Sequence, residues 1–150
     1  MAAQSQYAEL ARQISAISGI RRTLARRLPV ECPSGAAAVL ALLARHGEMR
    51  MSRLADLLAI DMSVTSRHVA HVVERGWVER ALDPEDRRSR LLRLTPAGRD
   101  MIAELHRRTS EVFARNLHDW SDDDVGRLIT MLDRLRDSFG DCRTLPEDQR

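Results

Sequence analysis

Apolar residues recur at helical intervals through the first part of the chain. Their spacing predicts one helix over residues 4–28, because the intervals keep them near one side of a helix. These apolar positions are Tyr7, Leu10, Ile14, Ile17, Leu24 and Leu28. Arginines crowd the end of the segment, where cations meet the negative pole of the helix dipole. Pro29 and Pro33 then break the helix.

Further helices are predicted in the next part of the chain. Ser34 is a suitable N-cap for a helix rich in alanine and leucine. The apolar pattern predicts a short helix at about residues 51–59. After a tight connection, Asp61 is a suitable N-cap for a helix that ends at about Arg75, where a glycine follows. This arrangement predicts a helix-turn-helix at about residues 50–76.

A β-hairpin is predicted directly after the helix-turn-helix. Residues 77–80 and 91–94 are typical of two short strands, and the stretch between them is polar and turn-forming. The hairpin is therefore long and has a charged tip. A hairpin beside a helix-turn-helix is the pattern of a winged helix, in which the second helix lies in the major groove of DNA.

Helical spacing returns after the hairpin. Thr95 as N-cap and Pro96 as the first helical residue predict a long helix. Ser121 and Asp124 have the spacing of a capping box, which predicts a last helix. That helix carries an apolar stripe at 3-4-3-4 spacing, formed by Val125, Leu128, Leu132, Leu135 and Phe139. The elements predict one mainly α-helical domain with a small β-hairpin wing.

Charge changes this picture through its distribution. The net charge is +2, but residues 119–150 carry −4 and residues 1–118 carry +6. All 24 basic residues are arginine, which suits bidentate contacts to phosphate and guanine. A GC-rich genome explains the choice of arginine by itself. A positive body is suited to a polyanionic partner but does not prove one.

Cysteine usage and hydropathy bound the location of the chain. Cys32 and Cys142 match no metal-site or disulfide-framework spacing, and we expect Cys32 to be structural or merely tolerated. No signal-peptide pattern is present, and no apolar run approaches 18 residues. We therefore expect a soluble, cytoplasmic protein without membrane association, metal or other cofactor. Residues 141–150 are expected to form a frayed tail.

The helix that ends near Arg75 has two distinct faces. Thr65, Val69, Val72 and Val73 fall on one face and are expected to pack inward. The other face begins with small and hydroxyl side chains, which let a helix approach base edges, and it includes an arginine that can reach guanine or phosphate. That outer face is formed by Ser63, Val64, Ser66, Arg67, Ala70 and His71. An ordinary solvated face explains the same residues about equally well.

The tip of the predicted hairpin concentrates charge. Three arginines follow three acids there, namely Asp83, Glu85, Asp86, Arg87, Arg88 and Arg90. A guanidinium that enters a minor groove must be held in a fixed direction, and Asp86 is placed to hold one. The alternative is a charged turn whose acids and bases cancel locally.

Four segments of the chain carry a family pattern. They run from Leu54 to Arg67, from Glu74 to Arg80, from Asp83 to Ser89, and from Leu92 to Gly98. The charged wing followed by Thr-Pro-x-Gly is the most specific part. Together with the helices on both sides, these segments resemble the MarR family of bacterial transcriptional regulators, and the resemblance covers nearly the whole chain.

The resemblance implies a homodimer. Dimerisation would involve helices in about residues 4–30 and 100–140, and residues 34–98 would form the winged helix-turn-helix. Each subunit is expected to bind one half of a pseudo-palindromic operator in double-stranded DNA, as a repressor. The stripe on the last helix agrees with dimerisation, although such stripes more often form an intramolecular core.

The resemblance also implies specific DNA contacts. Arg88 would enter the minor groove, braced by Asp86. The full set of expected contacts is Ser52, Arg53, Ser63, Val64, Thr65, Ser66, Arg67, His68, His71, Asp86, Arg87, Arg88 and Arg90. Two positions depart from the family pattern. Arg50 replaces the usual Thr or Ser cap, so either Ser52 caps the short helix or that helix begins later. His68 replaces an apolar residue, so it either packs half-buried or points to a phosphate.

Relatives in this family often bind small aromatic acids or other anions in a cleft between the dimerisation part and the winged helix. Here the cleft would be lined by Arg21, Arg22, His46, Met51 and Trp77. Surface charge and ordinary packing are the more frequent explanation of such residues.

Other classes of site have weaker support. His68 and His71 are spaced i, i+3, but no nearby side chain completes a metal site. The sequence has no phosphate-loop, nucleophile-elbow or zinc-hydrolase motif, so we expect no catalytic residue and no enzymatic activity. A winged helix that binds protein is the remaining alternative, but such a wing has no need for both Arg87 and Arg88 at its tip.

Overall fold

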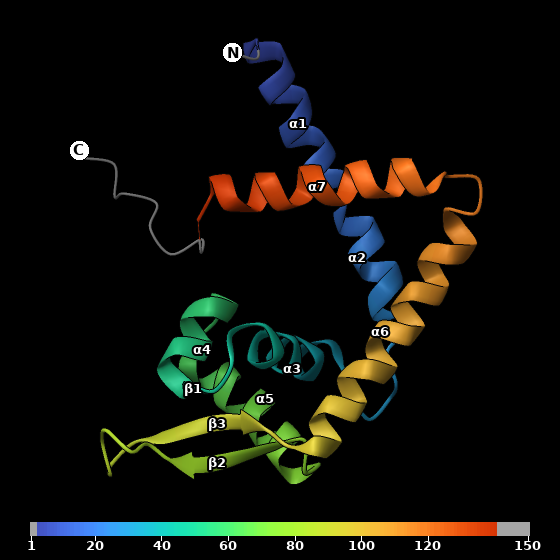
Figure 1. Ribbon diagram of the computed structural model, residues 1–150. Coiled ribbons are helices and arrows are strands. Elements are labelled where there is room, and N and C mark those ends of the chain that lie inside the picture. Colours follow the sequence, from blue (N-terminus) through green and yellow to red (C-terminus); the bar gives the residue numbers. More distant parts are fainter. Residues whose placement is uncertain (1–2, 141–150) are drawn as a thin grey trace, which may run out of the picture.

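The computed structural model describes residues 3–140, in which the chain forms helices and a three-stranded antiparallel sheet (Figure 1). The elements are α1 (Gln4–Ala16), α2 (Ser18–Ala25), α3 (Ser34–His46), β1 (Met49–Arg50), α4 (Met51–Leu58), α5 (Met62–Glu74), β2 (Val78–Leu82), β3 (Arg90–Leu94), α6 (Pro96–Asn116) and α7 (Asp122–Ser138). Helices α3 to α5 and the sheet form one unit, and α6 leads from it toward α1, α2 and α7. The predicted mainly α-helical class with a small β wing is confirmed.

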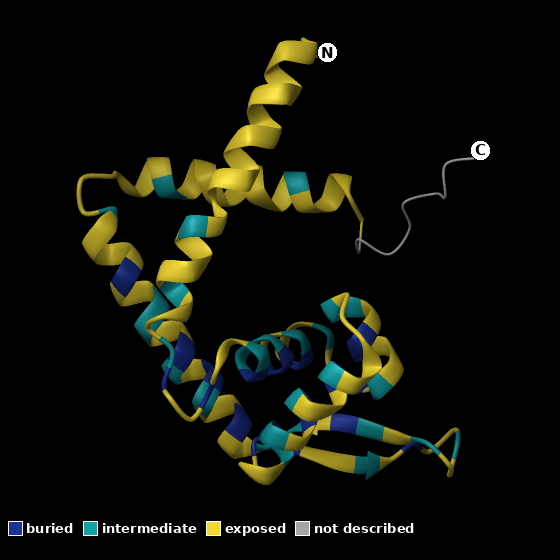
Figure 2. Cartoon of the chain, turned by 180° about the vertical axis from the view of Figure 1, so that it is seen from behind, coloured by how far each residue is buried: buried dark blue, intermediate teal, exposed yellow. Residues whose placement is uncertain are grey.

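The hydrophobic core lies between α3, α4, α5, the sheet and the first half of α6, which contributes Ile102 and Leu105 (Figure 2). Leu40 of α3, Leu54 of α4, Val69 of α5 and Leu92 of β3 are fully buried within it. Thr65, the one polar residue predicted to face inward, is also buried, and its hydroxyl donates to the Asp61 carbonyl at 3.1 Å. The inward face predicted for α5 is therefore confirmed, and its polar group is satisfied.

The sheet is larger than the predicted hairpin. Strand β3 pairs with β2 on one side and with β1 on the other, and Met49 lies opposite Leu92. A strand of two residues is too short to produce a period-2 pattern, so the sequence did not indicate it. The hairpin strands are also longer than predicted, which leaves residues 83–89 as the loop.

The start of α6 is locked against the backbone of Trp77. As predicted, Thr95 is the N-cap, and its hydroxyl accepts the Gly98 amide at 3.1 Å. The same hydroxyl donates to the Gly76 carbonyl at 2.6 Å, and the Thr95 amide donates to the Trp77 carbonyl at 3.0 Å. A Cβ atom at Gly98 would lie 2.1 Å from that carbonyl oxygen, so only glycine fits. The Thr-Pro-x-Gly segment is thus a fixed joint between the hairpin and α6.

Several predicted helix ends differ from the structure. The first helix is divided at Ile17, where the Ser18-Gly19 pair follows, a combination that commonly kinks helices. Neither Ser34 nor Ser52 is a cap, because α3 begins at Ser34 itself and α4 begins one residue before Ser52. Asp61 occupies the N-cap position of α5 without a side-chain cap bond. The Ser121–Asp124 capping box of α7 is present as predicted.

The apolar faces of α1, α2 and α7 lack an intramolecular core. None of these three helices contains a buried residue in the described part of the chain. Leu10 of α1 and Leu132 of α7 are exposed, and Phe139 at the end of α7 is 62% exposed. Among residues 3–140, no helix has the length and apolarity needed to cross a membrane.

Cys32 is the cysteine that lies within the described residues. Cys32 is fully buried, and burial, together with the charge of Glu31, raises the pKa of its thiol. A buried thiol with a raised pKa is a poor nucleophile, which agrees with a structural role. Cys142 and the tail predicted at residues 141–150 lie outside the described residues.

We predict that Gly98→Ala destabilises the protein by about 1–3 kcal/mol, because the added methyl group overlaps the Trp77 carbonyl. Urea unfolding followed by circular dichroism measures the change. Gly126→Ala in α7 is the matched control, since a Cβ there meets nothing within 4 Å. The control should be neutral or stabilising. Equal stabilities for the two variants would contradict the close approach at Gly98.

Candidate nucleic-acid interface

The exposed face of α5 is formed by its first two turns. Ser63, Ser66 and Arg67 are exposed there, and Val64 is half-buried. The turn before α5 is tight because Ala59, which ends α4, adopts a left-handed conformation with φ 54°. Thr65 points into the core. A buried hydroxyl cannot reach a base edge, so the burial of Thr65 disfavours the DNA contact expected of it.

The two histidines of α5 hold the helix to the rest of the unit. The His68 ring lies over Gly35 at the start of α3, so close that a Cβ at Gly35 would be 2.2 Å from it. His71 Nε2 lies 2.8 Å from the Glu31 carbonyl oxygen. Because a carbonyl only accepts, this nitrogen carries the hydrogen and donates. The His71 ring also meets Trp77 edge-on, with centroids 6.1 Å apart.

These contacts decide between the readings of the two histidines. His68 is half-buried and packs on Gly35, and His71 is engaged by the Glu31 carbonyl and by Trp77. Within residues 3–140, no group of three or more His, Cys, Asp or Glu side chains is arranged to hold a metal ion.

The wing tip is ordered by Asp86. Its Oδ1 accepts the Arg88 amide at 3.0 Å, and its Oδ2 accepts the Ser89 hydroxyl at 2.8 Å. These two hydrogen bonds lower the pKa of Asp86, so the carboxylate is ionised at neutral pH. The structure differs from the expectation that Asp86 holds a guanidinium, because Asp86 holds the backbone amide of Arg88 instead. Arg87 and Arg88 are exposed at the tip.

The root of the wing contains an ion pair that the sequence did not reveal. Asp83 is buried, and the Arg50 guanidinium donates to it through Nε at 2.8 Å. The two residues are 33 positions apart, and neither matches a motif that pairs them. The only signal was the unusual residue at position 50. Ser52 and Arg53 follow on the first turn of α4 and are exposed, and Arg90 ends the loop with a weak contact to the Arg87 carbonyl at 3.4 Å.

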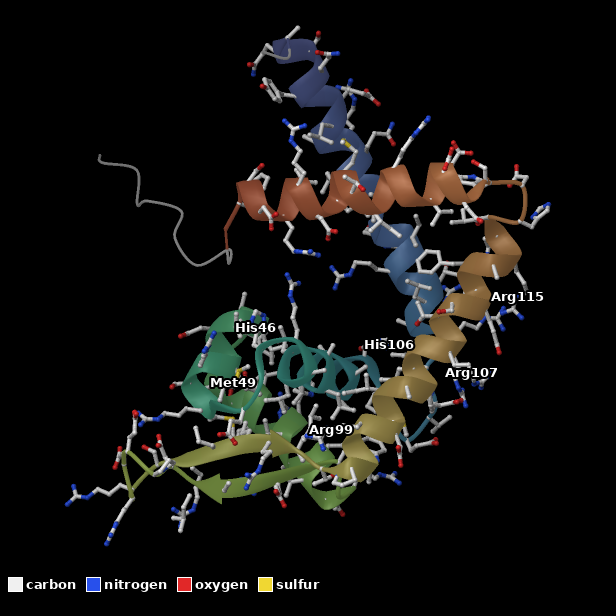
Figure 3. All side chains as sticks on the ribbon, viewed as in Figure 1. His46, Met49, Arg99, His106, Arg107 and Arg115 are labelled. Carbon is white, nitrogen blue, oxygen red and sulfur yellow. The ribbon has the colours of Figure 1, made fainter. Side chains whose placement is uncertain are left out.

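The residues expected to form an effector cleft do not gather at one site. Trp77 is 7% exposed and belongs to the core, and Met51 packs against that core. Arg21 and Arg22 are exposed on α2, while His46 lies at the end of α3 (Figure 3). For Trp77 the alternative of ordinary packing holds, because its side chain belongs to the hydrophobic core.

A different cavity lies between the end of α3, β3 and the base of α6. Its volume is about 420 Å³, and it contains none of the five expected residues. It is lined by Leu43, Ala44, Gly47, Glu48, Arg93, Leu94, Arg99 and Ile102. Leu43, Leu94 and Ile102 are its large apolar lining residues, and Glu48, Arg93 and Arg99 are its charged ones. Arg93 pairs with Glu79 at 3.1 Å and approaches Glu48 at 3.9 Å, whereas Arg99, labelled in Figure 3, has no carboxylate within 4 Å among the described residues.

Comparison with known proteins matches a family model to the part of the chain that contains α3, α4, α5 and the wing loop. The model for the MarR family matches residues 33–89. The HTH-type transcriptional regulator YdgJ of Bacillus subtilis is 31% identical over 101 residues, which span 67% of this chain and 62% of that protein. A putative transcriptional regulatory protein for the hcr operon of Thauera aromatica is 30% identical over 126 residues, which span 82% of this chain and 73% of that protein.

Solved structures share the fold. A cysteine-to-serine mutant of Escherichia coli MarR superposes with a TM-score of 0.72 and 24% identity, covering 84% of this chain and 95% of that one. The same mutant in complex with operator DNA superposes with a TM-score of 0.64 and 22% identity, covering 90% and 99%.

We predict that Asp86→Ala loosens the wing tip. Loss of a hydrogen bond worth about 1 kcal/mol should speed amide exchange at Arg88 roughly fivefold, measured by NMR. Glu85→Ala is the matched control, because it removes a neighbouring charge without removing the acceptor of the Arg88 amide. Equal exchange rates in the two variants would show that Asp86 does not order the tip.

Proposed function

Because the chain belongs to the MarR family of DNA-binding transcriptional regulators, whose members are not enzymes, we propose that it is a homodimeric repressor of a pseudo-palindromic operator. The observation that carries the proposal is the combination of an exposed, small-residue face on α5 with an ordered wing that presents Arg87 and Arg88. A related protein of Pseudomonas putida, 30% identical over 95 residues, is named as the HTH-type transcriptional repressor IacR, which supports repression.

Dimerisation is supported by the unpartnered faces of α1 and α7. Leu10 and Ile14 of α1 face Leu135 and Phe139 of α7 across an apolar groove of about 760 Å³. Burial of apolar surface contributes about 25 cal/mol per Å², so these faces favour association. We propose that a second copy of the chain covers them and that the two winged helices then face two operator half-sites.

The proposed division of DNA contacts follows the geometry. Ser63, Ser66 and Arg67 of α5 reach base edges and phosphates in the major groove. Arg88 enters the adjacent minor groove, where its guanidinium meets the enhanced negative potential of A·T-rich DNA. Ser52 and Arg53 at the start of α4 contact phosphates. The fixed joint at Thr95 attaches the unit of α3, α4, α5 and the sheet, which we call the reading unit, to α6 and hence to the dimerisation part.

We further propose that a small carboxylate with an apolar body binds the cavity at the base of α6 and releases the operator. Leu43 and Ile102 provide apolar walls, and Arg99 at the rim supplies a guanidinium that no described carboxylate occupies. A pocket of this size and mixed lining suits a ligand of that class. The wall at Glu48 leads directly into β1, so a ligand there is in position to shift the sheet and the wing.

Footprinting tests the operator proposal. Purified protein on the DNA upstream of its own gene should protect two half-sites whose centres lie about 10 base pairs apart. On the outer side of each half-site, the adjacent minor groove should also be protected, because Arg88 is proposed to enter it. Absence of protection on any palindromic segment at low salt would count decisively against sequence-specific repression of that promoter region.

Calorimetry with a panel of small aromatic carboxylates, beginning with benzoate, tests the effector proposal. Binding should be accompanied by release of operator DNA in a gel-shift assay. Arg99→Gln should weaken binding by tenfold or more, because a charge-assisted hydrogen bond contributes about 1.5–3 kcal/mol. Arg45→Ala, which removes an exposed arginine outside the cavity, is the control. Binding that Arg99→Gln leaves unchanged would place the ligand elsewhere.

A further inference from the structure

The contact between Arg50 and Asp83 joins the helix-turn-helix to the wing. Arg50 donates to Asp83 Oδ2 through Nε at 2.8 Å and through Nη2 at 2.5 Å. The other carboxylate oxygen accepts the Glu85 amide at 2.9 Å. The Asp83 side chain is 7% exposed, whereas that of Arg50 is 44% exposed. The carboxylate is therefore the buried partner, and its accepting oxygens are both engaged.

The two residues occupy strategic places in the fold. Arg50 lies in β1 opposite Leu91 and directly precedes α4. Asp83 directly follows β2 and closes the wing loop, because its amide donates to the Ser89 carbonyl at 3.3 Å and its carbonyl accepts the Asp86 amide at 3.3 Å. A shift of Asp83 would therefore move the whole loop that carries Arg88.

The energetics favour a lasting contact. A buried carboxylate without a partner is costly, and removing one member of a buried ion pair usually destabilises a protein. The Glu85 amide and the Arg50 guanidinium hold the pKa of Asp83 below its ordinary value, so the carboxylate is ionised at neutral pH. A short side chain at position 50 would not extend as far as a guanidinium, and Asp83 would lose its cation.

We propose that Arg50 is a positioning residue of the wing, which sets the reach of Arg88 through Asp83 and does not itself bind a phosphate. The proposal rests on the proposed function, namely that the wing reads a minor groove. It assigns Arg50 an effect on flank preference rather than on general affinity. A phosphate that recruited Arg50 would have to withdraw the cation from a buried carboxylate, which disfavours that alternative.

The test compares two operators that share their half-sites and differ only in A·T-rich or G·C-rich flanks. Affinities are measured over a salt series for the wild type, Arg50→Met, Arg88→Ala and the double variant. Arg50→Met keeps the volume of the side chain without its charge. Glu79→Gln is the control, because it breaks a cross-strand ion pair of the same hairpin that does not involve Asp83.

The proposal predicts that Arg50→Met and Arg88→Ala each weaken binding to the A·T-flanked operator by about fivefold or more and change the G·C-flanked operator little. The double variant should bind no more weakly than Arg88→Ala alone, since both changes remove the same contact. The slope of log binding constant against log salt concentration, here called the salt slope, should be the same for Arg50→Met as for Arg88→Ala. Arg50→Lys should restore part of the flank preference, and Glu79→Gln should behave as wild type.

Two results would overturn the proposal. Equal losses on both operators, additive with Arg88→Ala and accompanied by a salt slope lower by about one, would identify Arg50 as a phosphate contact. If Arg88→Ala leaves the flank preference intact, the minor-groove role of the wing fails, and the role of Arg50 fails with it. In that case, the binding of Arg88→Ala to the operator half-sites still tests the proposed function independently of the role of Arg50.

A measurement without DNA guards against a folding defect. Far-UV circular dichroism should show unchanged helix content for Arg50→Met and for Asp83→Asn. In both variants, amide exchange at Ser89 should be faster than in wild type, while exchange in α5 stays the same. Unchanged exchange at Ser89 in both variants would show that the pair does not hold the wing.

Discussion

The approach of the Trp77 backbone to the first turn of α6 is the constraint on which the remaining geometry depends. It leaves no room for a side chain at Gly98, and the Thr95 hydroxyl joins the two segments by accepting one hydrogen bond and donating another. The reading unit is thereby attached to the long helix at a fixed angle. In the proposed dimer built on α1 and α7, this attachment would determine how far apart the two copies of α5 lie.

Carboxylates organise the wing from its root to its tip. The Asp83 carboxylate accepts hydrogen bonds from the Arg50 guanidinium and the Glu85 amide. The Asp86 carboxylate accepts hydrogen bonds from the Arg88 amide and the Ser89 hydroxyl. Both groups are ionised at neutral pH, because these donors lower the pKa of each carboxyl. The wing arginines at the tip are left without a carboxylate on their guanidinium groups among the described residues. An ordered backbone with free cations suits the minor-groove contact that we propose for Arg88.

Local signals predicted most of the fold. The inward face of α5, the Thr95 cap and the Ser121 capping box depend on residues a few positions apart, and all are present. What escaped prediction depends on distant packing. Strand β1 exists because β3 lies beside it, and no periodicity can develop in two residues.

The candidate site was predictable to a similar extent. The exposed positions of Ser63, Ser66 and Arg67 on α5 and of Arg87 and Arg88 on the wing agree with the helical spacing and the polar loop of the sequence, whereas their DNA contacts were implied by the family resemblance and stay a prediction. The pairing of Arg50 with Asp83 was not, because it joins residues that only the sheet brings together. The five residues expected to line an effector cleft do not lie together, since Trp77 is part of the core while Arg21 and Arg22 are exposed on α2. A tryptophan beside a turn carries no local signal of its burial.

A crystal structure of the protein bound to its operator would test the central claim most directly. The account predicts two subunits joined through α1 and α7, α5 in the major groove, and Arg88 in the minor groove, with Arg50 still paired to Asp83. An operator complex in which Arg50 has left Asp83 for a phosphate, or in which the wing lies clear of the DNA, would contradict it.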